Sequence, residues 1–411
     1  MNEQRLLERF LRYVQVDTTA RDGAAAHPSS PGQIALGRIV ADELRQAGIE
    51  DVVQDEHGSV MATVPATVRS QPPVIAFCAH LDTSPETSGA GVKPQVVASY
   101  GGGDLTLPGD PSRVIRVVEN PEMATLIGRT LITSDGTTLL GADDKAGVAA
   151  IVEAAVWLAE HPEIRHGRVR LCFTCDEEIG HGVDHLDLAR LGAAVCYTLD
   201  GQGADMIDVE TFSADRARVT IRGVNIHPSI AKGRMTNALR VAANFLQRLP
   251  HWTLSPETSE GRQGFLHPYE IHGGVGQVEI AILLRDFQTP RLADLQGLLL
   301  QAAAATMLDY PAAKIEVQTV RQYRNMAEGL LREPRAVSHA QLALERLGRK
   351  AELTIVRGGT DGSRLTELGL PTPNLSTGEH NPHSPLEWAC LEEMVQAGQW
   401  VIALTEVWGG N

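Results

Sequence analysis

Apolar residues recur at two spacings along the chain. Near its start, Leu6, Phe10 and Val14 follow helical intervals, which predicts an amphipathic helix that ends before Asp17. Farther along, short continuous apolar runs predict buried strands, and the longer segments between them predict helices. We expect strands at residues 60–64, 74–79, 168–175 and 195–199, and helices at 32–47 and 145–160. This alternation predicts an α/β domain with a mixed, mainly parallel sheet and helices on both faces.

The rhythm changes after about Phe212. The order becomes strand, helix, strand, strand, helix, strand, at residues 216–223, 236–249, 265–271, 277–285, 290–308 and 314–320. This is the order of a ferredoxin-like α+β unit. The α/β rhythm returns after Arg321, with elements at 334–347, 354–356 and 391–407. We therefore expect one discontinuous domain, residues 1–212 and 321–411, interrupted by a smaller inserted domain, residues 213–320.

The composition narrows the class of protein. Of the 411 residues, 43% are hydrophobic and 21% are charged, as in ordinary globular chains. The net charge of −15 argues against nucleic-acid or anionic-membrane partners, which need clustered Lys and Arg. No apolar run approaches ~18 residues, and we expect no export by the usual signal peptide. The five scattered cysteines favour reduced thiols and a cytoplasmic location.

Histidines and acidic residues gather where the expected strands end. They are His80 and Asp82, Asp143 and Asp144, the run Asp176, Glu177 and Glu178, then Asp200, His380 and His383. Each group alone also has a structural interpretation, as a strand end, a turn or a favourable charge at a helix N-terminus. The run of three acids fits this interpretation less well, because adjacent like charges at a sheet edge are costly unless cations offset them.

Taken together, these groups predict a metal centre. The carboxyl ends of parallel strands meet at one edge of a sheet, so we expect the side chains to share one rim. Imidazole nitrogens and carboxylate oxygens in this number suit two divalent ions, with zinc expected first and cobalt or manganese also compatible. One carboxylate would bridge the two ions, and each ion would keep a position open for water.

Several segments resemble the peptidase T tripeptide aminopeptidases of the dinuclear zinc aminopeptidase and carboxypeptidase family. They are HLDTSP, TLLGADDKAG, DEE-x-G, TLDG, HPSIAKG with a following TNAL, RDF, RGGTDG and PNLSTG, in family order over nearly the whole chain. The resemblance implies two zinc sites, held by His80, Asp143 and Asp200 and by Asp143, Glu178 and His383. Asp143 would bridge the ions, and the peptide bond that follows it would be cis.

The resemblance also implies roles beyond metal binding. Glu177 would be the general base, and Asp82 would orient His80. His227 would reach across a homodimer, from an inserted lid and dimerisation domain, to stabilise the oxyanion. Arg285 and Arg357 would clamp the terminal carboxylate of the substrate. Both arginines also have structural alternatives: an edge-strand ion pair for Arg285, with Asp286 or a neighbour, and a turn for Arg357.

The chain departs from the family pattern near the last ligand. After His383 the family usually has glycine and, three residues on, a second histidine, whereas this chain has Ser384 and Leu386. Ser229 and Cys175 stand where glycine and proline are usual. These changes leave the expected ligands in place and weaken the expectation about substrate length.

The expected activity is removal of the N-terminal residue from short peptides, above all tripeptides. Water activated between two zinc ions would attack the peptide bond, with Glu177 as general base. A carboxypeptidase, dipeptidase or N-acyl amino acid amidohydrolase with the same centre stays open as an alternative. So does a catalytically silent scaffold that binds peptides.

Overall fold

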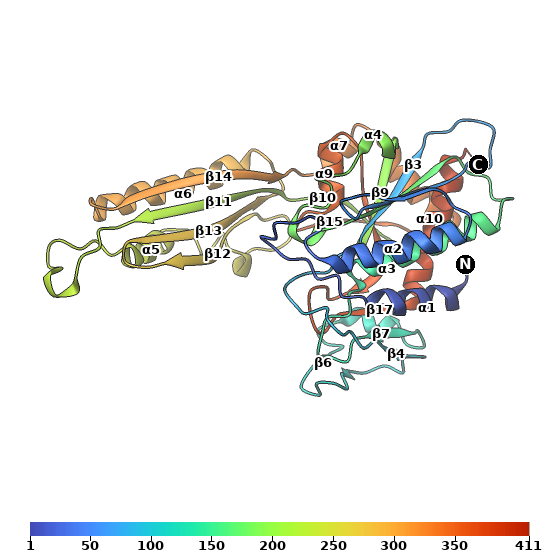
Figure 1. Cartoon of the computed structure of the whole chain (residues 1–411), viewed down its shortest axis with the longest axis horizontal. Helices are drawn as coiled ribbons and strands as arrows, with labels where there is room; N and C mark the ends of the chain where they lie inside the picture. Colours follow the sequence, from blue (N-terminus) through green and yellow to red (C-terminus); the bar gives the residue numbers. More distant parts are fainter. Residues whose placement is uncertain (411) are drawn as a thin grey trace. The chain divides into compact units, whose positions relative to one another are not determined.

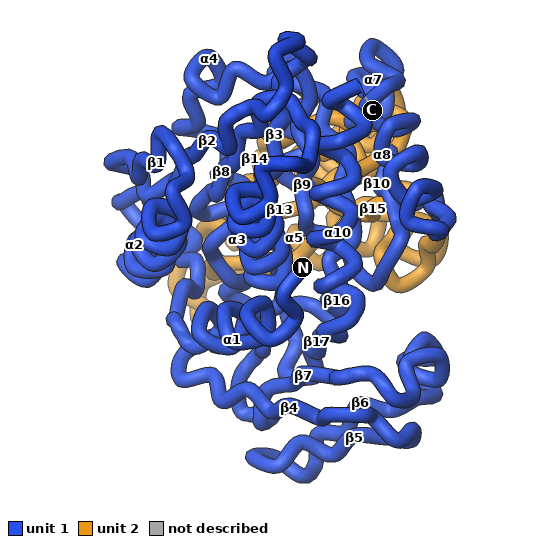
Figure 2. Tube along the Cα trace, turned by 90° about the vertical axis from the view of Figure 1, so that its right-hand side faces the viewer, with its two compact units in different colours: residues 1–209, 326–354, 360–411 blue, residues 210–325, 355–359 orange. Residues whose placement is uncertain are grey.

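The computed structural model describes residues 1–410, which form two compact units (Figure 2). Unit 1 comprises residues 1–209, 326–354 and 360 onward, and unit 2 comprises residues 210–325 and 355–359. The sequence did not suggest that residues 355–359 join unit 2. The domain limits at 213 and 320 stay a prediction.

Unit 1 is built on an eleven-stranded mixed sheet (Figure 1). The main path runs β1 (Glu50–Gln54), β2 (Val60–Val64), β8 (Val169–Thr174), β3 (Ile75–His80), β9 (Val195–Gln202), β16 (Asn374–His380), β17 (Trp388–Cys390), β7 (Leu131–Thr133) and β4 (Gln95–Val97). β10 (Met206–Thr211) pairs with β16 and with β15 (Glu352–Val356). The four central strands β8, β3, β9 and β16 are parallel, as expected. The pairings outward from them, from β8 to β1 and from β16 to β4, are antiparallel, so less of the sheet is parallel than the sequence predicted.

Alternating residues of the central strands enter two separate cores, because successive side chains of a strand point to opposite faces. Ile75, Phe77 and Ala79 of β3 belong to the larger core, and Ala76 and Cys78 belong to a smaller one. The long helices of the larger core are α1 (Glu3–Val14), α2 (Pro31–Gln46), α3 (Ala142–Glu160), α8 (Arg335–Arg346) and α10 (Leu391–Trp408). The helices α4 (Leu188–Leu191) and α9 (Asp361–Glu367) contribute to the smaller core. Helices on both faces are thus confirmed.

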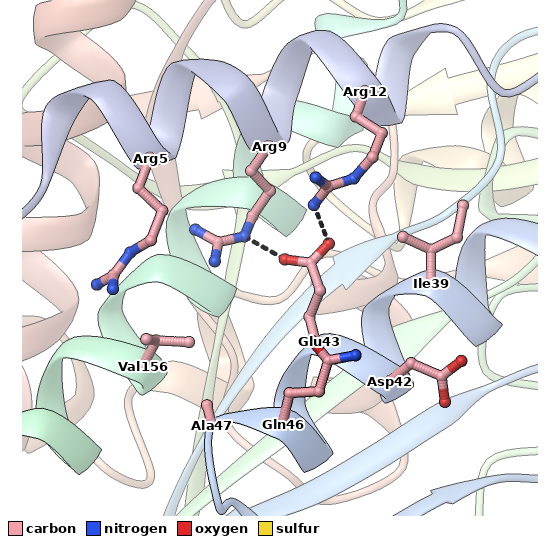
Figure 3. A pocket seen from close by; sticks show the side chains of 9 residues that line it. All are labelled: Arg5, Arg9, Arg12, Ile39, Asp42, Glu43, Gln46, Ala47 and Val156. Carbon is pink, nitrogen blue, oxygen red and sulfur yellow. Dashed lines mark hydrogen bonds and ion pairs between the residues drawn. The ribbon is translucent and has the colours of Figure 1, made fainter.

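Three arginines of α1 tie this helix to α2 and α3. Arg9 Nε lies 2.7 Å from Glu43 Oε2, and Arg9 Nη1 lies 2.5 Å from Glu153 Oε2. Arg12 also pairs with Glu43, while Arg5 pairs with Glu153 and with Glu160. The three guanidinium groups line a pocket, and Figure 3 shows those of Arg9 and Arg12 turned toward Glu43. Since each arginine already has a carboxylate partner, this pocket has no spare positive charge for an anion.

Unit 2 has the ferredoxin-like order that the sequence predicted. Its antiparallel sheet runs β12 (Phe265–Gly273), β13 (Gln277–Asp286), β11 (Ser213–Arg222) and β14 (Lys314–Tyr323). The helices α5 (Ala238–Gln247) and α6 (Arg291–Asp309) contribute to its apolar core. The chain order of these six elements is strand, helix, strand, strand, helix, strand.

Several short elements complete the structure, and the sequence pattern did not predict most of them. They are β5 (Leu105–Thr106), β6 (Val114–Ile115), α7 (Ala327–Leu330) and the 3-10 turns η1 (Pro121–Thr125), η2 (Glu177–Ile179), η3 (Pro228–Ile230) and η4 (Pro256–Thr258). Among residues 1–410, none of the helices combines the length and apolar character needed to span a bilayer.

Candidate metal centre

The structure brings the five predicted metal ligands together at the carboxyl end of the parallel strands. His80 is the last residue of β3, and Asp200 lies near the end of β9. Asp143 stands in the first turn of α3, and Glu178 stands in η2, just after β8. His383 follows β16 in a loop and has a φ of 61°.

These side chains form two groups that share Asp143. His80 Nε2 lies 2.9 Å from Asp143 Oδ1 and 3.4 Å from Asp200 Oδ1. His383 Nε2 lies 2.9 Å from Glu178 Oε2 and 3.3 Å from Asp143 Oδ2. Within each group the possible ligand atoms lie within 4.8 Å of one another. Asp143 therefore presents one oxygen to each group, which is the geometry required of a bridging carboxylate.

The two adjacent aspartates have different positions. The Asp143–Asp144 peptide bond is cis, as the resemblance implied. Asp143 has a ψ of 105°, outside the helical range, and its carboxylate faces the two histidines. The buried Asp144 accepts the backbone N–H of His80 at 3.0 Å and that of Gly147 at 3.2 Å. Asp144 therefore has the structural role expected of an acid at a helix start, whereas the carboxylate of Asp143 faces the centre.

The three consecutive acids do not all face the centre. Asp176 is turned away and accepts hydrogen bonds from Ser29 N at 2.7 Å and Gln33 Nε2 at 2.6 Å. Asp82 accepts the backbone N–H of Glu177 at 3.1 Å and that of Glu178 at 3.0 Å. Asp82 thus fixes the turn that presents both glutamates, a task that the sequence did not reveal.

Asp82 also lies beside His80. The Nδ1 atom of His80 is 3.1 Å from the backbone oxygen of Asp82 and 3.5 Å from its Oδ1. A ligating imidazole usually gives its second N–H to such an oxygen, which sets the ring orientation and leaves Nε2 for a metal. The geometry therefore suits the orienting role predicted for Asp82.

Charge in the centre perturbs both histidines and Asp143. Burial opposes protonation of His80, but the carboxylates of Asp200 and Asp143 hold its pKa well above the usual value. Burial likewise opposes protonation of His383, yet its hydrogen bonds to Asp143 and Glu178 raise its pKa to about 12. Burial also disfavours the charged form of Asp143, whose pKa is nevertheless lowered by its hydrogen bonds to the two histidines. The carboxylates of the centre therefore favour a positive charge at both histidine positions.

The remaining carboxylates show the cost of gathering negative charge. Burial, and next the charge of Asp143, raises the pKa of Glu178 to about 8 and that of Asp200 to about 6. Burial is also the main cause that raises the pKa of Glu177 well above its usual value, with Asp200 adding to it. Divalent cations would offset this repulsion.

The donor set fits two divalent ions. Each group offers one imidazole nitrogen and two carboxylates, the three protein ligands typical of a metal that keeps a position for water. The Oε1 atom of Glu178 is buried and has no hydrogen-bond partner among the described residues. A buried carboxylate oxygen without a partner is costly, and a metal ligand bond would satisfy it.

Two further glutamates at the centre were missed. Glu379 is buried and forms a third acidic group with Asp144 and Asp200, and its Oε2 has no hydrogen-bond partner in the described structure. Glu387 accepts three backbone N–H groups in the segment that contains Asp143. The only sequence signal was that both flank His383, in GEHNPHSPLEW.

The three predicted substrate-binding residues all belong to unit 2. Arg285 donates to the backbone oxygens of Asp215 at 3.0 Å and Leu284 at 3.1 Å. Among the described residues, Arg285 forms no ion pair with Asp286. Its structural contacts are these hydrogen bonds to backbone carbonyls, in place of the expected ion pair. Arg357 donates to the oxygens of Gly261 and Gln263, at 2.7 and 2.9 Å. The roles of both arginines in binding substrate stay predictions.

His227 is an exposed side chain at the start of η3. Its Nδ1 accepts the backbone N–H of Ser229 at 3.2 Å. In a neutral imidazole the other nitrogen then has the proton, so Nε2 is a hydrogen-bond donor.

Comparison with known proteins identifies the family to which the chain belongs. The model of peptidase family M20/M25/M40 matches residues 135–406. Peptidase T of Geobacillus kaustophilus is 41% identical over 405 residues, covering 98% of each chain. Peptidase T of Bacillus subtilis is 39% identical over 404 residues, again covering 98% of each chain.

A solved structure agrees with these relatives. The crystal structure of aminopeptidase PepT from Bacillus cereus is 26% identical in sequence and matches with a TM-score of 0.76 over 100% of both chains. The chain thus belongs to peptidase family M20/M25/M40, among relatives called peptidase T, and is a metal-dependent aminopeptidase.

Proposed function

We propose that the protein releases the N-terminal residue of short peptides, above all tripeptides, and that it does so with two zinc ions. The observation that supports the dinuclear site best is the position of Asp143, with one oxygen toward His80 and the other toward His383. The relatives called peptidase T support the choice of substrate. Imidazole and carboxylate ligands are common at catalytic zinc sites.

In this proposal, one ion is held by His80, Asp143 and Asp200 and the other by Asp143, Glu178 and His383. When bound, two such ions polarise the scissile carbonyl and make a water molecule more acidic.

Glu177 is the proposed general base. Asp82 holds its backbone N–H, and the side chain lies near enough to His80 and Asp200 for their charges to affect its pKa. A carboxylate with a raised pKa suits both halves of the task, because it must accept a proton from water and later give one to the leaving amine.

Unit 2 would supply the groups that bind the peptide. We propose that Arg285 and Arg357 hold the terminal carboxylate, which a guanidinium group can bind through two parallel hydrogen bonds. His227 would donate from Nε2 to the developing oxyanion of a site in the partner subunit of a homodimer. In this arrangement unit 2 is both the lid and the dimerisation domain.

We also propose a cytoplasmic location. All five cysteines are buried and free. Cys78 and Cys172 are direct neighbours in the parallel pair of β3 and β8. Neighbouring free thiols suit a reducing compartment, where glutathione and thioredoxin keep them reduced.

A panel of tripeptides tests the substrate assignment. Acetylation of the N-terminus or amidation of the C-terminus should each lower kcat/KM by about 10–100-fold, because a hydrogen bond to a charged group contributes about 1.5–3 kcal/mol. The free tripeptide is the matched control, and kcat/KM is measured for all three at one pH. A preference for the acetylated peptide would reject the aminopeptidase assignment in favour of an N-acyl amino acid amidohydrolase.

Mixed dimers test the role of His227. The His227→Ala variant should lose about 10²–10³-fold in kcat, as expected when one oxyanion donor is removed. Mixing it with the Glu177→Gln variant should restore activity well above the sum of the two, since each variant retains what the other lacks. The matched control is a His227→Ala/Glu177→Gln double variant. Mixed with either single variant, it should restore no activity. Absence of recovery in every mixture would rule out a role across the subunit interface.

A further inference from the structure

Glu387 is a buried carboxylate that binds the backbone in front of the predicted bridging ligand. Its Oε2 accepts the N–H groups of Leu140 and Gly141, both at 2.7 Å, and its Oε1 accepts the N–H of Asp143 at 3.0 Å. The side chain is 1% exposed. These amides lie at the N-terminus of α3, where backbone N–H groups have no helical partner and favour a negative charge.

The same glutamate belongs to the turn that presents His383. Its own N–H donates to Ser384 O at 3.1 Å. The backbone oxygen of His383 in turn accepts a hydrogen bond from Thr87 Oγ1 at 2.7 Å. Glu387 therefore connects two segments that are distant in sequence, one with Asp143 and the other with His383.

The two predicted metal positions depend on this connection to different degrees. His80 and Asp200 belong to the paired strands β3 and β9, whose backbone geometry is set by the sheet. In the other position, Asp143 and His383 both lie in segments that Glu387 joins.

We propose that Glu387 is a positioning residue that aligns the bridging Asp143 with His383. Its loss therefore weakens the metal position of Asp143, Glu178 and His383 more than the position of His80, Asp143 and Asp200. The inference rests on the proposed function, since it takes these five side chains as metal ligands.

The test is the Glu387→Gln variant. Glutamine keeps the size, but its NH₂ group cannot accept an N–H, so at least one of the three amides loses its partner. Calorimetric titration of Zn²⁺ into the metal-free variant should show, relative to the wild type, a dissociation constant about 10–100-fold higher for one ion and a smaller change for the other. Co²⁺ spectra of His383→Ala and His80→Ala variants identify which ion is which. Excess metal should recover much of the lost activity.

Glu392→Gln is the matched control. Glu392 also accepts a backbone N–H, from Thr130 at 3.0 and 2.9 Å, but this segment contains none of the predicted ligands. Its replacement should leave both metal affinities unchanged. If Glu387→Gln does not fold, Glu387→Asp gives the same readout, because the shorter carboxylate cannot reach all three amides.

The outcomes separate the inference from the proposed function. The inference alone would be overturned if the wild type binds two ions and both Glu387 variants bind them with unchanged or equally weakened affinities. A wild type that binds no pair of ions would overturn the proposed function and the inference together. A larger loss at the Asp143, Glu178 and His383 position supports the inference.

Discussion

Replacing Glu177 with glutamine should lower kcat by about 10²–10⁴-fold, the usual contribution of a general acid and base. Glutamine has nearly the same shape but cannot take the proton of the attacking water. The backbone contacts from Asp82 to residues 177 and 178 do not involve the side chain of Glu177, so the turn should persist. Both metal ions should therefore stay bound. The measurements are kcat with a tripeptide and metal content by elemental analysis.

The adjacent Glu178→Gln variant provides the comparison. It alters the same turn, but Glu178 is a predicted ligand, whose Oε2 lies 2.9 Å from His383 Nε2. This variant should lose metal as well as activity, and added metal should restore part of the activity. Added metal should not restore the Glu177→Gln variant. Near-normal turnover by Glu177→Gln would show that the general base is another group.

Replacing Asp143 with alanine should abolish activity and weaken both metal positions. Asp143 is the one side chain shared by the two ligand groups that contain the histidines, with an oxygen directed at each. Loss of an outer-shell partner already lowers metal affinity by about 10–100-fold, and loss of a direct ligand should cost more. Metal content after gel filtration, together with activity on a tripeptide, measures the effect.

The histidine variants are the control for the shared position. His80→Ala and His383→Ala each remove a ligand from one group only, so each should retain more metal than Asp143→Ala. Circular dichroism should confirm that all three variants are folded. If Asp143→Ala retained two ions with the affinity of the wild type, Asp143 would not be the bridge.

The elements that the sequence predicted well are those with a strong local pattern. The strands β3, β8 and β9 are mostly apolar, and α1 has a clear helical stripe, so the local pattern indicates them. The strands β5 and β6 have two residues each and no periodicity to detect. Outer antiparallel strands such as β1 and β4 are short and at most half-buried, so the sequence pattern did not show them and the parallel part of the sheet was overestimated.

The candidate site was predictable where its reactive residues are adjacent in the sequence. It was less predictable where the orientation of a side chain depends on residues that are close only in space. The local pattern alone could not say which acid of the 176–178 run turns away, because this depends on Ser29 and Gln33. Only the family resemblance pointed to Glu177 and Glu178. Glu387 lies in the pattern HSP-x-E-W, but the pattern does not reveal its partners, which are backbone N–H groups, the nearest of them 244 residues away in sequence. Backbone N–H groups occur at every residue except proline and leave no signature in the sequence.

The discontinuity of unit 1 has a consequence for protein synthesis. His383 and Glu387 are made after residues 210–325 of unit 2, although they join a centre whose other predicted ligands precede unit 2. A growing chain that has completed Asp200 and the ferredoxin-like elements still lacks the predicted ligand His383 and the carboxylate of Glu387, which accepts the N–H of Asp143. We therefore expect that a chain still on the ribosome has no complete hydrolytic centre until it has returned to unit 1 and passed Glu387.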